Sequence, residues 1–95
     1  MKRWALLISG RVQGVCYRMS VWRYVEQNLP EVKGFVQNLP DRRVEVVAEG
    51  NLDDLNKLYQ YCLEGSSASR VDNIELIEKE SCSEFEKFTI LQSYT

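Results

Sequence analysis

Residues 10–18 read Gly-Arg-Val-Gln-Gly-Val-Cys-Tyr-Arg, and they separate an apolar run at residues 4–8 from a segment with helical spacing. The two glycines, Gly10 and Gly14, allow a tight turn that leaves backbone N–H groups uncovered. Such N–H groups at the start of a helix form a cradle for an anion, and Arg18 adds a permanently charged, forked donor for phosphate oxygens. The spacing predicts a phosphate-binding loop, although an ordinary strand-to-helix turn with a surface arginine explains it equally well.

Length and composition predict one globular domain over residues 1–95. The chain is 44% hydrophobic and 27% charged, which is ordinary for a soluble protein that buries a core without disulfides. No apolar run approaches the ~20 residues of a membrane-spanning helix. Cys16, Cys62 and Cys82 have no close pairing, which favours reduced thiols without excluding one disulfide. We therefore expect a cytoplasmic protein that does not associate with membranes.

Charge is distributed unevenly along the chain. Residues 1–43 contain eight Lys/Arg and three Asp/Glu, whereas residues 44–95 contain four Lys/Arg and eleven Asp/Glu. The basic half includes the predicted loop, so its charge would steer a small anionic ligand toward that loop. The whole chain carries a net charge of −2, which argues against a broad nucleic-acid surface.

Hydrophobic periodicity alternates between two and 3.6 residues along the chain. It predicts strands at residues 3–9, 34–39, 44–49, 71–76 and 85–91, helices at 18–28 and 51–64, and a polar connection at 78–84. This order is a ferredoxin-like α+β sandwich, βαββαβ, with a mainly antiparallel sheet, two helices on one face and a short extra C-terminal strand.

Local signals mark the ends of the helices and one face of the third strand. Pro30 ends the first helix. Asn51 is the expected N-cap of the second helix, and Gly65 is expected to end it. Glu45 and Glu49 share a face of the third strand, which we interpret as a solvated face rather than an acid–base pair.

The predicted topology brings Arg18 close to Asn38. The first two strands are joined by a helical crossover, so they run parallel and end at the same edge of the sheet. The loop at residues 10–18 leaves the first strand at that edge, and Asn38 ends the second strand there. The arginine and the asparagine therefore form a candidate site.

Two stretches resemble the signatures of the acylphosphatase family. Residues 10–18 match a pattern of glycine, any residue, Val-Gln-Gly-Val, any residue, an aromatic and arginine. Residues 34–38, Gly-Phe-Val-Gln-Asn, are similar to the second signature, with Val44 and Gly50 at the expected distances. Two long motifs in the right order are a specific signal, and the likeness covers essentially the whole chain.

The resemblance implies hydrolysis of acyl phosphates to a carboxylate and inorganic phosphate, without a metal, a cofactor or a covalent phosphoenzyme. Arg18 and Asn38 would be the catalytic residues, with the arginine on the phosphoryl group and the asparagine orienting the attacking water. The phosphate-binding residues would be Gln13, Gly14, Val15, Cys16, Tyr17 and Arg18. We expect a monomer whose partners are the substrate and the phosphate product, with no nucleic acid.

The amino-acid composition is compatible with this chemistry on grounds that do not depend on the resemblance. The chain has no histidine, which excludes a histidine nucleophile or base. An acyl phosphate expels a carboxylate whose conjugate acid has a pKa of roughly 4, so the leaving group needs no acid catalyst. Charge stabilisation and positioning of water are the remaining tasks.

Two other functions fit parts of the sequence. RNA-binding modules of this topology stack bases on aromatic residues of a central strand, but residues 44–49 contain none. A catalytically silent phosphate- or anion-binding regulatory domain is the stronger alternative, because binding requires only the loop.

Several side chains near the loop have structural interpretations. Tyr17 and Trp22 are expected in the core, and Cys16 is expected to be a half-buried thiol without a role. We interpret Arg42 and Arg43 as solvated turn charges. The resemblance places glycine at position 42, so arginine there predicts lower stability or a remodelled hairpin.

Overall fold

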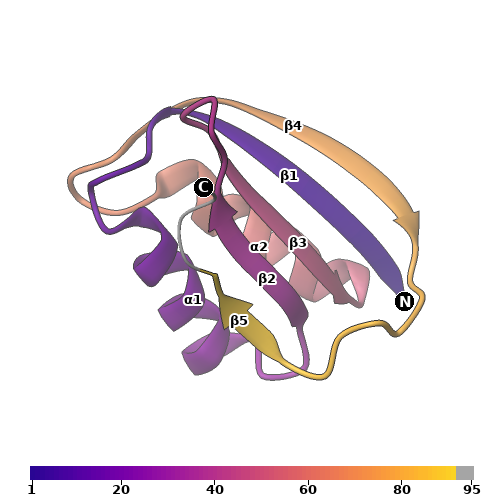
Figure 1. Cartoon of the computed structure of the whole chain (residues 1–95). Coiled ribbons are helices and arrows are strands. Elements are labelled where there is room, and N and C mark those ends of the chain that lie inside the picture. Colours follow the sequence, from indigo (N-terminus) through magenta and orange to yellow (C-terminus); the bar gives the residue numbers. More distant parts are fainter. Residues whose placement is uncertain (92–95) are drawn as a thin grey trace.

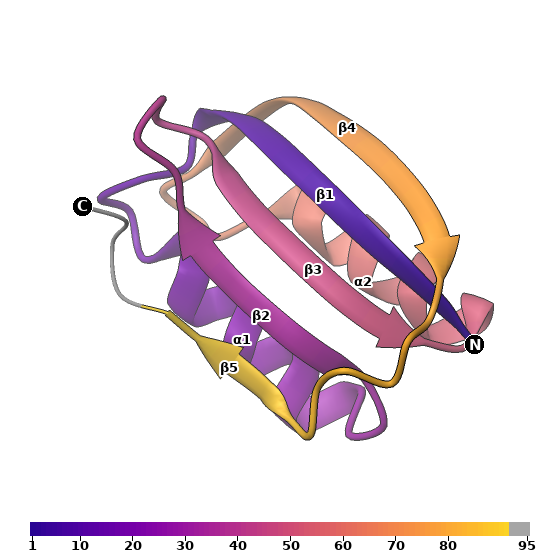
Figure 2. The ribbon, with the colours of Figure 1, turned by 45° about the vertical axis from the view of Figure 1, so that its right-hand side comes forward.

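The computed structural model describes residues 1–91 and confirms the predicted α+β architecture (Figure 1). Its elements in chain order are β1 (Lys2–Arg11), α1 (Tyr17–Asn28), β2 (Lys33–Asn38), β3 (Val44–Gly50), α2 (Leu52–Glu64), β4 (Arg70–Glu80) and β5 (Phe88–Ile90). The sheet has the order β4-β1-β3-β2-β5. Both helices cover the same face of this sheet (Figure 2).

The strand directions place the ends of β1 and β2 at one edge of the sheet. Strand β3 lies between them and is antiparallel to each, so β1 and β2 run parallel to one another. Strand β5 adds to the outer side of β2 in parallel. The β2–β3 hairpin and the loop that leaves β1 consequently lie side by side (Figures 1 and 2).

The core lies between the sheet and the two helices. Alternate residues of β1 point into it, and Leu6 and Ile8 are fully buried. Helix α1 contributes Val21 and Val25, and α2 contributes Leu55, Leu58 and Cys62. Burying each aliphatic side chain of this size contributes roughly 1.5–3 kcal/mol, so the apolar stripes fix the helices on the sheet.

The end of β1, which leads into the loop, pairs with β4 across a β-bulge whose extra residue is Asp72 of β4. The register with β4 shifts between Ser9 and Gly10. A Cβ atom on Gly10 would lie 2.1 Å from the carbonyl oxygen of Arg70, so only glycine allows this close approach of the two strands.

The predicted helix boundaries are close to those observed. The Asn51 side chain accepts a hydrogen bond from the Asp54 backbone N–H at 2.8 Å, which caps α2. Helix α2 ends at Gly65, whose N–H donates to the Tyr61 carbonyl. Among the described residues, no helix is long and apolar enough to span a membrane.

Strand β4 is longer than the sequence predicts. It runs to Glu80, so the first residues of the expected polar connection continue the strand opposite Lys2, Arg3 and Trp4. Strand β4 forms the edge of the sheet, and its side chains are mostly exposed. Polar residues are therefore accommodated there, and the alternation of apolar residues that would predict a strand is lost. Glu78 accepts a hydrogen bond from the Trp4 indole N–H at 2.8 Å.

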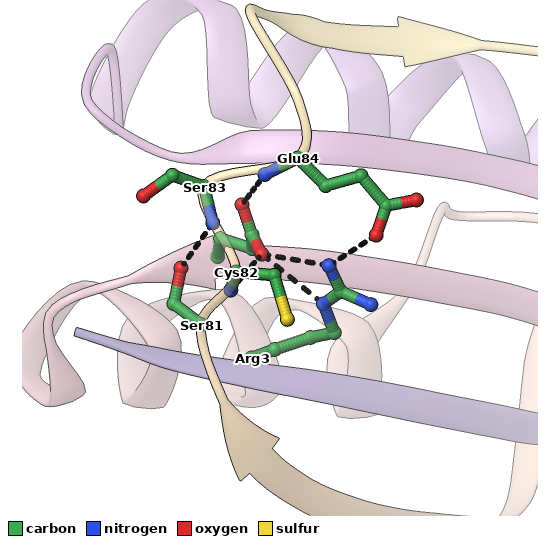
Figure 3. Close-up of polar contacts among 6 residues, drawn as sticks. Arg3, Ser81, Cys82, Ser83 and Glu84 are labelled. Atoms are coloured by element: carbon green, nitrogen blue, oxygen red, sulfur yellow. Dashed lines mark hydrogen bonds and ion pairs between the residues drawn. The ribbon is translucent and has the colours of Figure 1, made fainter.

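Glu49 does not lie on a solvated face, which corrects the interpretation of the third strand. It is 3% exposed, and its carboxylate accepts hydrogen bonds from Arg3 at 2.9 and 3.1 Å. The same carboxylate accepts the backbone N–H groups of Cys82 and Glu84 at 3.1 and 3.2 Å (Figure 3). Burial alone raises the pKa of Glu49, but these donors outweigh burial and hold its pKa below the ordinary value.

Candidate active site

The candidate site is a pocket of about 400 Å³ at the edge where β1 and β2 end. Arg18 and Asn38 both line it, although the first is in α1 and the second ends β2. The other lining residues come from the loop, the start of α1 and β5: Val12, Gly14, Cys16, Tyr17, Met19 and Ile90. The pocket therefore brings together the two side chains that the topology places near one another.

Asn38 reaches this pocket because of strand alternation. Val36, two residues earlier, is fully buried beneath the helices, so Asn38 lies on the same face of β2. Asn38 pairs with Val44 in the ladder with β3, and it is half-buried. The backbone of β2 thus places the Asn38 side chain on the face of the sheet that borders the pocket.

The loop enters α1 through two left-handed residues. Gly14 has φ +73°, and nothing lies within 4 Å of the Cβ that a substitution would add, so its backbone conformation is what favours glycine. Cys16 precedes the helix with φ +61°. Its side chain is exposed, which corrects the expectation of a half-buried thiol.

The start of α1 is open, unlike the start of α2. Within residues 1–91 no side chain caps α1, and its first turn contains no acidic residue. Helix α2 has the Asn51 cap and also Asp53 and Asp54 in its first turn. The first N–H groups of a helix require partners and attract negative charge, so the N-terminus of α1 suits an external anion.

Gln13 ties the loop to the β2–β3 hairpin. Its side-chain Nε2 donates to the backbone carbonyls of Leu39 and Arg43, both at 2.9 Å. These carbonyls flank the turn that follows Asn38. The side chain of Gln13 therefore positions the loop against the hairpin, a role that the sequence did not indicate.

Two further residues of the predicted loop contribute to packing. Tyr17 is 1% exposed and its hydroxyl donates to the Cys62 carbonyl at 2.7 Å, in agreement with the expected core position. Burial raises the pKa of the Tyr17 hydroxyl above its ordinary value. Val15 packs against the core, and its carbonyl accepts the Ser66 hydroxyl at 3.1 Å. The side chains of Tyr17 and Val15 thus anchor the loop.

Arg18 and Trp22 connect α1 to the segment of β5. The Arg18 Nη1 donates to the backbone carbonyl of Leu91. The partly buried indole of Trp22 donates to the Phe88 carbonyl at 3.2 Å. A guanidinium has five N–H donors, so the contact with Leu91 orients Arg18 while using one of them.

The three cysteines are free thiols and belong to different environments. Cys16 lines the pocket, Cys82 is exposed near Glu49, and Cys62 is buried in α2. Burial raises the pKa of the Cys62 thiol to about 12, which keeps it protonated. Across the part of the chain that the structure describes, no three Cys, Asp or Glu side chains gather into a metal-binding group.

Comparison with known proteins identifies the family. The acylphosphatase family model matches residues 4–90. The chain is 44% identical to an acylphosphatase of Marinobacter nauticus, over 93% of this chain and 94% of that protein. It is 40% identical to one of Methylococcus capsulatus, over 97% and 98% of the two chains. The crystal structure of acylphosphatase from Bacillus subtilis superimposes with a TM-score of 0.89 at 32% identity, covering 96% of this chain and 99% of that one. The chain therefore belongs to the acylphosphatase family of hydrolases.

Proposed function

We propose that this protein hydrolyses the carboxyl–phosphate bond of acyl phosphates, releasing a carboxylate and inorganic phosphate. Arg18 and the backbone N–H groups of residues 13–18 hold the phosphoryl group, and Asn38 orients the attacking water. The observation that carries this proposal is that Arg18 and Asn38 line one pocket at the uncapped start of α1.

Binding of the phosphoryl group combines two kinds of donor. The N–H groups at the start of α1 bring the positive end of the helix dipole to the phosphoryl oxygens. The Arg18 guanidinium adds charge-assisted hydrogen bonds, which are roughly twice as strong as neutral ones. Negative charge on the transferred group is spread over its oxygens in the transition state, so these donors lower the barrier.

The chemical step needs positioning more than proton transfer. A water oxygen forms a bond to phosphorus while the bond from phosphorus to the acyl oxygen breaks, and the carboxylate leaves with the electron pair. The proton of the water moves to a phosphoryl oxygen of the substrate, so no protein base takes part. The Asn38 amide holds the water in line with the leaving carboxylate, and fixing that geometry supplies much of the rate enhancement.

The test is the rate of benzoyl phosphate hydrolysis in the presence of EDTA. We expect turnover by the parent protein and a loss of kcat/KM of about 10²–10³-fold in Arg18→Ala, as for the removal of other preorganised transition-state donors. Asn38→Ala is expected to lower kcat with a smaller change in KM, since its partner is the water rather than the phosphoryl group.

Matched controls separate these roles from general effects. Arg23→Ala removes an exposed arginine of the same helix, and Asn56→Ala removes an exposed amide of α2; both are expected to retain the parental rate. A parent that binds inorganic phosphate in a titration but does not hydrolyse benzoyl phosphate contradicts the proposal. That result identifies a silent anion-binding domain.

A further inference from the structure

A second pocket lies beside the same loop. It has a volume of about 330 Å³ and is lined by Gly10, Arg11, Val12, Gln13 and Arg42. Val12 also lines the pocket of Arg18 and Asn38, so the two pockets share a wall. The second pocket lies between the end of β1 and the β2–β3 hairpin, which are adjacent in both ribbon views (Figures 1 and 2).

The two arginines of this pocket are not neutralised by nearby carboxylates. Arg11 and Arg42 are exposed, and within residues 1–91 neither side chain forms an ion pair or a hydrogen bond. Arg43 and Arg70, by contrast, each form an ion pair with an aspartate. Arg43 forms an ion pair with Asp41 at 2.8 Å, and Arg70 forms one with Asp72 at 3.0 Å.

The backbone holds Arg42 in place beside the loop. Arg42 has φ +74°, a conformation that favours glycine, yet it donates its N–H to the Leu39 carbonyl at 3.2 Å in a closed turn. The Leu39 N–H in turn donates to the Arg43 carbonyl at 2.8 Å. Gln13 donates to the same two carbonyls from the loop side, so hydrogen bonds join the hairpin to the loop beside this pocket.

We propose that Arg11 and Arg42 form a subsite for a second anionic group, a carboxylate or a phosphate, carried on the acyl portion of the substrate. This inference rests on the proposed hydrolysis of acyl phosphates. With the phosphoryl group held at Arg18, the acyl portion must extend out of that pocket, and the pocket next to it is lined by two arginines that form no ion pair within residues 1–91. Planar, forked donors of this kind bind carboxylates and phosphates with defined geometry. The protein then prefers acyl phosphates with a charged acyl group over neutral ones.

The test compares benzoyl phosphate with its 3- and 4-carboxylated analogues. All three have a benzoyl ring and the same type of scissile bond, and the two isomers place the added carboxylate at different distances from the phosphoryl group. The measured quantity is the ratio of kcat/KM for each carboxylated substrate to kcat/KM for benzoyl phosphate. We expect the parent to prefer at least one isomer, mainly through a lower KM.

The variants are Arg42→Gly and Arg11→Gln, and each is expected to lower this ratio by about three- to fivefold, as is usual for an exposed charge pair. Arg42→Gly also relieves the positive φ, so a loss of preference in this variant does not result from unfolding. Arg42→Lys keeps the charge without the fork and is expected to lower the ratio less. Arg23→Ala removes one positive charge outside both pockets and serves as the matched control.

The outcomes distinguish the subsite from the proposed function. Hydrolysis of all three substrates with no preference, or with a ratio unchanged in Arg42→Gly and Arg11→Gln, overturns the subsite and leaves the proposed function intact. An equal fall in Arg23→Ala shows a general effect of net charge and also overturns it. A parent that hydrolyses none of the substrates refutes the proposed function and the subsite with it.

Discussion

Two regions of this protein contain an arginine together with backbone N–H donors that suit an anion. In only one of these regions does a carboxylate of the chain itself accept the hydrogen bonds. The carboxylate of Glu49, in β3, accepts hydrogen bonds from Arg3 and from the N–H groups of Cys82 and Glu84 in the loop after β4 (Figure 3). The loop after β1 combines Arg18 with the N–H groups at the start of α1, and no acidic residue lies in the first turn of that helix.

The difference shows what separates a structural contact from a binding site. At Glu49 the anion is part of the chain, and hydrogen bonds from an arginine and from backbone N–H groups stabilise this buried negative charge and lower its pKa. At Arg18 similar donors face a pocket that is open to solutes. A carboxylate of the chain itself accepts the hydrogen bonds of the donors at Glu49, whereas the first turn of α1 contains no acidic residue that could do the same.

Placing a carboxylate in the open site is expected to have the largest effect after the loss of Arg18 itself. Cys16 lines the pocket and is exposed, so Cys16→Asp adds a negative charge next to the proposed phosphoryl site. Two such charges about 5 Å apart repel by roughly 3 kcal/mol at an effective dielectric constant of ~20. This corresponds to a loss of about 10²-fold in kcat/KM for benzoyl phosphate.

The neutral control for this substitution is Cys16→Asn, which has almost the same shape as aspartate and tolerates the left-handed backbone equally well. We expect it to keep most of the parental kcat/KM. Equal losses in the two variants would show that the thiol or the shape of residue 16 matters, and not the charge.

Inorganic phosphate is expected to bind at the open site and not at Glu49, and this binding should stabilise the folded protein. Phosphate at a hundred times its dissociation constant stabilises a folded protein by about 2.7 kcal/mol, measured as a rise in Tm. Arg18→Ala should abolish this rise, whereas Glu49→Gln should start from a lower Tm and show the same rise. An unchanged rise in Arg18→Ala would place the phosphate outside the predicted loop.

Glu49 is expected to make stability depend on pH in the acid range. Its folded-state pKa lies below the unfolded value of 4.5, so its contribution is complete above that pH and is lost as the pH falls through the folded-state pKa. Glu49→Gln should cost about 1.5–3 kcal/mol near neutral pH, typical of hydrogen bonds to a charged group. The difference between the parent and the variant, measured by urea unfolding, should shrink below pH 4.5.

The order of elements and the meeting of Arg18 with Asn38 were predictable because they depend on local periodicity and on a general rule of topology. Apolar spacing distinguishes helix from strand within a few residues, and one crossover orients β1 and β2 in parallel. Predicting either feature does not require knowing which side chains are in contact.

The contacts that sequence reasoning missed join distant segments. Glu49 is the same residue type as Glu45 on the same strand face, and only the loop after β4 folding over one of them buries it. Gln13 meets the hairpin carbonyls, and Arg18 meets Leu91, through contacts that no local pattern encodes. The apolar residues of β5 were the available signal that the C-terminal segment would reach the site.

The smallest expected effect is the release of backbone strain at Arg42, next to the open site. The turn keeps its hydrogen bonds with Arg42 at φ +74°, so it is not remodelled to avoid that conformation. Arg42→Gly should therefore stabilise the protein by about 1 kcal/mol, or raise Tm by about 4–8 °C for a chain of this length. Arg42→Ala is the control, because it removes the same charge and retains the strained side chain. If glycine and alanine at this position give the same Tm, the strain argument is wrong, and the positive φ costs this hairpin nothing.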